Sequence, residues 1–292
     1  MTNLVEASTS ATAAAFEHDG PMGKAFLSFY GLRDNPFADS VNPAFFYRTE
    51  AHGDALERMM LTIENDISLG MITGLSGTGK TLLSQLVLQQ LDAGKYCPVL
   101  VLVSPGLSKT GLLREILSEL NVALPAGVAR TQELIKLLSN CVIDLHHQGR
   151  KLVIIIDECH FLSGDNLHII RTISNIEIPE RKLVTCLLFG EARFTQRLQH
   201  PSFDSIRNRM YLQCELPTMS EADCAEFVKF RLMSAGGHDD LFDAEALAAV
   251  HTHSGGVSRS VNKICMLALL EGFLARKQSI DAALVDRAAA RS

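Results

Sequence analysis

The segment GLSGTGKT at residues 74–81 constrains the fold of this chain more than any other stretch. It matches the pattern G-x-x-x-x-G-K-[ST] in full, and it stands between an apolar run, LGMITG, and a helical pattern, KTLLSQLVLQQLDAG (80–94). Glycines at such positions let backbone N–H groups wrap around phosphate oxygens, and the helix N-terminus adds positive potential. We therefore predict a phosphate-binding loop between a buried strand and a helix. Its candidate phosphate-binding glycines are Gly74, Gly77 and Gly79.

Two side chains of this loop and two carboxylates further along the chain complete the predicted site. Lys80 can reach the β- and γ-phosphates of a nucleotide, and the Thr81 hydroxyl can hold Mg²⁺. The run LVIIIDECH (152–160) places Asp157 and Glu158 at the end of a second buried strand, which meets the same crevice. Asp157 would orient Mg²⁺ through its water shell, and Glu158 would polarise the attacking water. The sequence therefore predicts a site for ATP and Mg²⁺, with Lys80 and Glu158 as catalytic residues.

The letters DECH also fit the D-E-x-H box of a nucleic-acid helicase. A helicase of that type needs two such cores to grip and move a strand. This chain has one core, followed by helical patterns only, so the helicase interpretation is disfavoured. Cys159 and His160 are then interpreted as the start of the next helix, or as contacts of neighbouring switch residues.

Buried strands alternate with helices through residue 216. The run at 152–156 has no polar alternation, as expected for a strand buried on both faces. Such alternation implies right-handed crossovers and a parallel sheet covered by helices, which is the α/β class of a P-loop NTPase. The expected strands are 69–74, 97–103, 152–156, 183–190 and 211–216.

Strand patterns end at Pro217, and amphipathic helical patterns follow. They predict a C-terminal helical lid domain, and they lie at 221–237, 243–256, 258–277 and 281–290. We expect three parts in the chain: a flexible N-terminal arm at 1–27, a nucleotide-binding α/β core at 28–216 and the lid domain at 217–292. The segment 30–47 is rich in aromatic residues, Pro and Asn, and it is expected to pack on a neighbouring domain.

Composition narrows the function classes. The formal net charge of −6 gives no global basic footprint for nucleic acid, although a local patch stays open. None of the seven cysteines forms a C-x-x-C pair, so we interpret them as small buried residues of a reducing compartment. No stretch approaches the roughly 18 apolar residues of a membrane span, and the N-terminus lacks the pattern of a secretory signal. We therefore expect a soluble, cytoplasmic protein without membrane insertion.

Several segments, in order and spacing, match a known family over about residues 28–288. The core followed by a helical lid resembles the AAA+ ATPase plan, and the ordered set is similar to the ExeA-like ATPases, the family of general secretion pathway protein A. The segments that carry this resemblance are YGLRDNPF, NPAFFY, GLSGTGKT, VIIIDE, LLFGEARFTQRL, RMYLQCELPTMSEADCAEFVKFRL and SGGVSRSVNKIC.

The resemblance implies roles for further residues. Glu191 stands where the family usually has a Gln that senses the γ-phosphate, and an acid there is electrostatically awkward; its alternative role is to cap the helix ARFTQRL. Arg209 matches an arginine that could act as a finger on a neighbouring subunit's γ-phosphate, with Arg207 in reserve, and either could make an ordinary salt bridge instead. Arg259 matches a lid arginine that contacts the nucleotide. The segment 30–47 would cover the adenine side.

The same resemblance implies a nucleotide-switched ATPase that assembles with copies of itself, as a ring or a filament, and positions a partner machine. Secretion or pilus members carry a membrane helix and a peptidoglycan-binding domain after the core, whereas this chain stops at Ser292. Standalone relatives resemble MuB-type transposition regulators, which load on double-stranded DNA and recruit a transposase. The interpretation leans to that role, and a slow-hydrolysing scaffold is the alternative. The basic residues of interest for DNA are Lys109, Arg114, Arg181 and Lys182.

Overall fold

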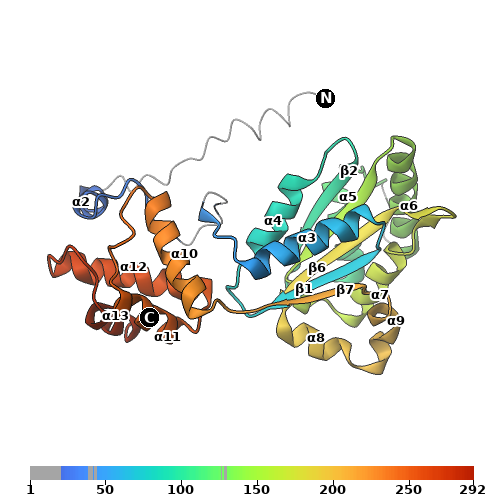
Figure 1. Ribbon diagram of the computed structural model, residues 1–292. Coiled ribbons are helices and arrows are strands. Elements are labelled where there is room, and N and C mark those ends of the chain that lie inside the picture. The colour runs from blue at the N-terminus through green and yellow to red at the C-terminus, as the bar shows by residue number, and fades with distance from the viewer. Residues whose placement is uncertain (1–20, 39–41, 43–44, 126, 128–129) are drawn as a thin grey trace.

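The computed structural model describes residues 21–38, 42, 45–125, 127 and 130–292. Figure 1 shows two bodies side by side, a sheet with helices on both faces and a separate group of helices. Two connecting segments of the chain join these bodies. One leads from α2 (Pro21–Phe29) to α3 (Glu50–Glu64), and the other leads from β7 (Leu212–Leu216) to α10 (Glu221–Ser234).

The sheet has five parallel strands in the order β2-β3-β6-β1-β7. Because all of them run the same way, their carboxyl ends meet at one edge, where ligands of such sheets bind. The expected α/β fold class is confirmed, and each strand lies within two residues of its expected start. The strands are β1 (Leu69–Gly74), β2 (Tyr96–Leu102), β3 (Lys151–Asp157), β6 (Val184–Glu191) and β7.

Helices cover both faces of the sheet because successive strand side chains point to opposite sides. Val153 and Ile155 of β3 pack with α3 and α4 (Lys80–Gln90). Ile154 and Ile156 belong to the larger cluster on the other face. The helices of that face are α5 (Lys109–Glu119), α6 (Thr131–His147), α7 (Gly164–Ile173) and α8 (Ala192–Leu198). This two-sided burial explains the unbroken apolar run of β3.

Short elements fill the remaining connections of the core. The turn η2 follows β3, and a small antiparallel hairpin follows α7. Sequence patterns did not predict the hairpin. These short elements are η2 (Cys159–Phe161), β4 (Glu177–Ile178), β5 (Arg181–Lys182), η3 (Pro201–Phe203) and α9 (Asp204–Arg207).

The C-terminal helices share a hydrophobic cluster of their own, separate from the two clusters of the sheet. They are α10, α11 (Ala244–Ser254), α12 (Ser258–Leu274) and α13 (Ala282–Ala289). We call this body the lid. Within the described ranges, no helix combines the length and the apolar character that a membrane crossing requires.

The helix α2 corrects one expectation about the N-terminus. Residues 21–27 were expected to be part of a flexible arm, but they are helical and pack on α12 of the lid. The rings of Phe26 and Phe273 meet edge-on with centroids 5.7 Å apart, and Tyr30 Oη donates to the carbonyl of Leu269 at 2.9 Å. Residues 1–20 of the expected arm lie outside the described residues.

The aromatic segment after α2 is attached to the lid by a buried cation. Arg231 of α10 is 6% exposed, and it donates to the carbonyls of Pro36 at 2.6 Å and Phe45 at 3.3 Å. Its guanidinium also lies 5.0 Å from the centroid of the Phe45 ring. Burial lowers the pKa of Arg231 to about 10, which still leaves it charged at neutral pH. Within 30–47, positions 39–41 and 43–44 lie outside the described residues.

Candidate nucleotide-binding site

The loop 74–81 turns sharply between β1 and α4. Gly77 and Gly79 have φ angles of +82° and +93°, in the left-handed region that favours glycine. Gly74 is needed for space instead, because a Cβ there would lie 3.0 Å from the carbonyl oxygen of Leu216 on β7. The loop therefore requires glycine at these three positions for its conformation and for its packing.

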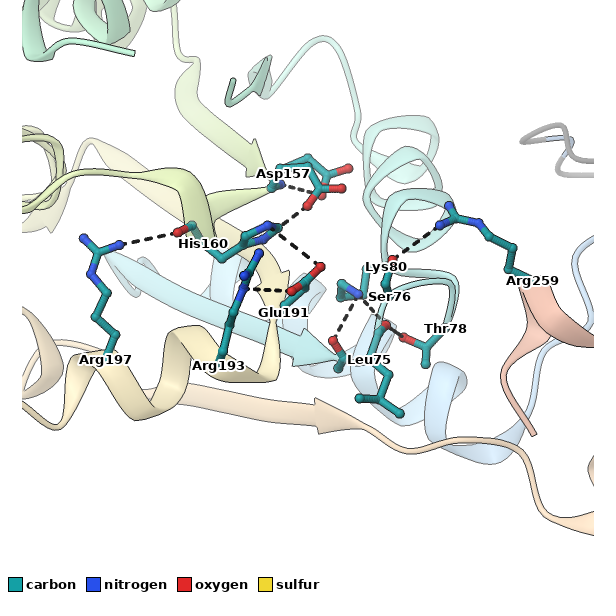
Figure 2. Close-up of polar contacts among 12 residues, drawn as sticks. Leu75, Ser76, Thr78, Lys80, Asp157, His160, Glu191, Arg193, Arg197 and Arg259 are labelled. Atoms are coloured by element: carbon teal, nitrogen blue, oxygen red, sulfur yellow. Dashed lines mark hydrogen bonds and ion pairs between the residues drawn. The ribbon is translucent and has the colours of Figure 1, made fainter. Parts of the chain in front are cut away.

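Lys80 begins α4, and its side chain bends back over the loop. The residue is 7% exposed, and Nζ donates to the carbonyls of Gly74 at 3.2 Å and Leu75 at 2.7 Å (Figure 2). Burial lowers the pKa of Lys80, and the nearby charges of Glu158, Asp157 and Glu191 oppose that shift. A desolvated ammonium held by two carbonyls can exchange them for phosphate oxygens at small cost in reorganisation.

A histidine that sequence reasoning missed supports the loop from α3. The imidazole of His52 is buried, with Nε2 3.0 Å from the carbonyl oxygen of Thr78 and Nδ1 2.6 Å from Oγ1 of Thr49. Burial is the largest influence on its pKa and lowers it, which favours the neutral ring. In the neutral form Nε2–H donates to Thr78 and Nδ1 accepts from Thr49. Only the fold brings α3 to this loop, so no local pattern indicates the contact.

Asp157 and Glu158 lie at the end of β3, as the apolar run predicts. Asp157 is 3% exposed, and its Oδ1 accepts from the backbone N–H of Glu158 at 2.8 Å. Glu158 has a φ angle of +55°, which is strained for a residue with a Cβ. That conformation turns its side chain into the cleft beside the loop, where Glu158 is a lining residue and Asp157 is not.

The residues present fit Mg²⁺ as it is usually bound with nucleotides. No group of three or more His, Cys, Asp or Glu side chains within the described residues could hold a metal ion by itself. Mg²⁺ commonly takes one or two protein oxygens and completes its shell with phosphates and water. The hydroxyl of Thr81, at the start of α4, and the carboxylate of Asp157 are hard oxygen donors of this kind.

Glu191 lies at the end of β6, paired in register with Gly74 of β1. It is the N-cap residue of α8, but its side chain makes no capping hydrogen bond, so the capping alternative is not realised. Oε2 instead pairs with Nε of Arg193 at 2.8 Å, and Oε1 lies 3.9 Å from Nε2 of His160 (Figure 2). The carboxylate lines the same cleft as Lys80.

The lid touches the phosphate loop directly at the start of α12. Ser258 Oγ donates to the carbonyl of Gly77 at 2.6 Å, and the backbone N–H of Arg259 donates to the same oxygen at 3.2 Å. The Arg259 guanidinium reaches Ser76 Oγ at 3.4 Å (Figure 2). A Cβ on Gly77 would lie 2.7 Å from Cβ of Arg259, so the absence of a side chain there permits this approach.

The cleft between core and lid has a charged end and an aromatic end. The charged end contains Lys80, Glu158, Glu191 and Arg259. The aromatic end is lined by Phe45, Phe46, Tyr47 and Phe227, together with Met219 and with Arg231, whose buried guanidinium donates to backbone carbonyls. A nucleotide likewise has a flat, largely apolar base at one end and a charged triphosphate at the other. The distribution of side chains therefore suits a nucleotide that lies along the cleft.

The two arginines considered as finger residues, Arg207 and Arg209, do not line the cleft of their own chain. Arg209 donates to Oδ1 of Asn175, and Arg207 pairs with Asp204 at 2.5 Å. Three of the four basic residues of interest for DNA are in ion pairs: Lys109 with Asp165 at 3.3 Å, Arg181 with Asp66 at 3.0 Å, and Lys182 with Glu177.

A glycine loop at the end of β1 and a carboxylate pair at the end of β3, with β6 between these strands, define a P-loop nucleotide-binding protein. A family model described as an AAA domain matches residues 64–198. General secretion pathway protein A of Aeromonas hydrophila is 32% identical over 252 residues, which cover 85% of this chain and 45% of that protein. The chain thus spans less than half the length of this relative. Over 85% of its length the chain is similar to this ExeA-type protein, and residues 64–198 match the AAA domain.

Solved structures share the fold at low sequence identity. The ORC2 protein of Aeropyrum pernix superposes with a TM-score of 0.67 at 15% identity, over 88% of this chain and 71% of that one. The ORC1 protein of the same organism, in complex with DNA, gives 0.63 at 20% identity, over 86% and 68%. The RuvB branch migration motor of Thermotoga maritima gives 0.55 at 16% identity, over 86% and 72%. These likenesses show the AAA fold with its C-terminal helices.

Proposed function

We propose that this protein binds ATP with Mg²⁺, hydrolyses it to ADP and phosphate, and uses the nucleotide state to control assembly with copies of itself. The observation that carries the proposal is the carbonyl of Gly77, which accepts hydrogen bonds from both Ser258 and Arg259 of the lid. A phosphate on the loop therefore acts on a segment that already holds the lid. Nucleotide binding and lid position are coupled through this one backbone group.

Each site residue has a role in this proposal. Lys80 exchanges its two carbonyl acceptors for phosphate oxygens and carries positive charge to them. Thr81 and Asp157 would hold Mg²⁺, which would supply charge neutralisation on the phosphates when bound. Glu158, turned into the cleft by its left-handed backbone, orients the attacking water and accepts its proton. Arg259 contacts the phosphates from the lid.

Assembly gives Arg209 a function that it lacks within one chain. It lies outside the cleft of its own subunit, so it can contribute to hydrolysis only at the site of a neighbour. We propose that it is an arginine finger in a ring or filament, with Arg207 as the alternative. Hydrolysis should then rise more steeply than linearly with protein concentration.

The partner machine is proposed from the sequence relative. At 32% identity the likeness to general secretion pathway protein A is far closer than any of the structural likenesses reported above, and it supports a secretion or pilus component, served from the cytoplasmic side. A DNA-associated regulator that recruits a transposase is the second candidate. The likeness to ORC1 in complex with DNA supports it, but the ion pairs of Lys109, Arg181 and Lys182 weaken the basic patch on which it depended.

Turnover and assembly measured together test the proposal. ATP hydrolysis is followed across a range of protein concentrations, with and without duplex DNA, while particle size is measured by light scattering with ATP, ADP or neither. The expected result is turnover that rises with ATP-dependent assembly. ATP-dependent assembly with negligible turnover at every concentration would instead support the slow-hydrolysing scaffold. DNA binding that falls steeply with salt would select the second candidate partner.

A further inference from the structure

A buried imidazole lies beside the carboxylates of the site. His160 belongs to the turn η2, and its side chain is 3% exposed. Nδ1 is 3.2 Å from Oε2 of Glu158, and Nε2 is 3.9 Å from Oε1 of Glu191 (Figure 2). Neither approach has hydrogen-bond geometry, and within the described residues neither ring nitrogen has a hydrogen-bond partner. Burial of a polar atom without a hydrogen-bond partner destabilises a fold by about 1–3 kcal/mol. Because the ring has no such partner, packing rather than hydrogen bonding holds it in place.

The packing that fixes the ring is specific. The Phe161 ring has its centroid 4.1 Å from that of His160, and Arg197 donates to the His160 carbonyl at 3.4 Å. Gly190 of β6 allows η2 to approach, because a Cβ there would lie 2.5 Å from Sγ of Cys159 and 3.2 Å from the backbone nitrogen of His160. The imidazole is therefore held against the sheet, between the ends of β3 and β6.

The two carboxylates beside the ring are freer than the ring itself. The side chain of Glu158 is 40% exposed and that of Glu191 is 29% exposed. Their exposure leaves room for the carboxylates to turn, although Glu191 is also paired with Arg193, whereas the buried imidazole has little room. A small rotation of either carboxylate would give the ring nitrogen facing it a partner.

The chemistry of the imidazole ring links the orientation of the Glu158 carboxylate to that of the Glu191 carboxylate. A neutral ring has one N–H donor, whereas both ionised carboxylates only accept. When the ring donates to one carboxylate it turns a lone pair toward the other, so the two hydrogen bonds are alternatives. Because Glu191 lies in the cleft near Lys80, a phosphate bound there repels its carboxylate and changes which bond is favoured.

We propose that His160 is a positioning residue for hydrolysis, which orients the carboxylate of Glu158 through Nδ1 and couples it to Glu191 through Nε2. This proposal rests on the proposed ATP hydrolysis. It explains why an acid can stand at the position of Glu191. Arg193 neutralises that acid, and His160 transmits its displacement to the base.

Three substitutions at one position test the proposal. The amide nitrogen of Asn can occupy the place of Nδ1, and that of Gln can occupy the place of Nε2. His160→Ala should lower kcat by about 10- to 100-fold, as expected when a catalytic group is misplaced by about 1 Å. His160→Asn should retain most of kcat, while His160→Gln should resemble the Ala variant. Affinity for ADP, measured by calorimetry, should change in none of them, and His168→Asn on the exposed face of α7 is the matched control.

A double-mutant cycle tests the coupling to Glu191. Glu191→Gln should change kcat in the wild-type background and have little further effect in His160→Ala, because the group that transmits it is gone. Equal kcat in all three His160 variants, a loss of ADP affinity parallel to kcat, or additive effects in the cycle would each overturn the proposal. If His160→Ala does not fold, the comparison of Asn with Gln decides. Wild-type protein that binds ATP but never hydrolyses it would refute the proposed function itself.

Discussion

Replacing Lys80 with Met isolates the contribution of one charge to nucleotide binding. Met has a similar length and an apolar end, so it fills the same buried place at the start of α4. The ammonium of Lys80 now donates to the carbonyls of Gly74 and Leu75, and with nucleotide bound it would donate to phosphate oxygens instead. The substitution removes both sets of bonds. The loss of affinity for nucleotide is therefore the difference between the phosphate bonds and the carbonyl bonds that they replace.

The magnitude follows from that exchange. Hydrogen bonds of a charged ammonium contribute about 1.5–3 kcal/mol each. The two bonds to phosphate, in which both partners are charged, lie near the upper value, and the two carbonyl bonds that they replace lie near the lower value. The net loss is about 2–3 kcal/mol, or a decrease in affinity of about 30- to 150-fold. Stability without nucleotide should change by less than about 1 kcal/mol, or about 2–4 °C in Tm, because removal of a desolvated charge offsets the lost attraction to Asp157, Glu158 and Glu191.

Two measurements on the same sample separate these effects. Calorimetric titration with ADP and Mg²⁺ gives the affinity, and thermal unfolding with and without the nucleotide gives both stabilities. Lys80→Met should unfold near the wild-type temperature and gain almost nothing from nucleotide, whereas Lys136→Met, on the exposed side of α6, should behave as wild type. An affinity within about threefold of wild type, well under 1 kcal/mol, would refute the assignment of Lys80 to the phosphates.

Further predictions concern the base, the assembly and the core. Glu158→Gln should bind ATP normally but hydrolyse it at least ~100-fold more slowly in steady-state assays. Arg209→Ala should bind nucleotide normally and lose only the concentration-dependent turnover, and mixing it with Glu158→Gln should restore some activity; no recovery in confirmed mixed assemblies would exclude it. Asp66→Asn leaves buried Lys151 without its carboxylate and should destabilise by about 2–3 kcal/mol in urea at pH 7, below the ~3–5 kcal/mol of a fully buried pair. Burial raises the pKa of Asp66, but hydrogen bonds from Lys151 and Arg181 outweigh burial and lower it, so this difference should begin to shrink near the ordinary carboxyl pKa and vanish only as the pH falls through the lowered pKa of the folded state.

The arrangement of the core could be predicted because its signals are local. A strand that is buried on both faces has an unbroken apolar sequence, and a phosphate-binding loop requires glycines at fixed spacing. Boundaries were less accurate where side chains compete with the helix. The helix expected to end at Gly94 ends at Gln90, since Leu91 is extended and Asp92 accepts from the backbone N–H of Gly94 at 2.8 Å. Such a local competition leaves little trace in the hydrophobic pattern.

Features that depend on distant parts of the chain could not be predicted. The helix α2 is short and contains Pro and Gly, and its partners on α12 lie more than 200 positions away, as the bond from Tyr30 to Leu269 shows. The contacts of His52 with Thr78 and of Arg231 with Pro36 are similar in kind. A pattern of residue types records which face of a helix is apolar, but not which element will cover it.

The lid contacts the candidate site at both ends of the cleft. A bound nucleotide could therefore affect the position of the lid. At the phosphate end, Ser258 donates to Gly77. At the aromatic end, Arg231 holds the segment that carries Phe45. A ligand that spans the cleft must therefore contact two parts of the lid, α12 directly and α10 through that segment, while its phosphates rest on the core. Because a packed helical body moves as a unit, we expect loss of the phosphate contact to change the orientation of the whole lid. In the proposed assembly, the position of the lid, rather than any single side chain, is then the quantity that a neighbouring subunit would detect.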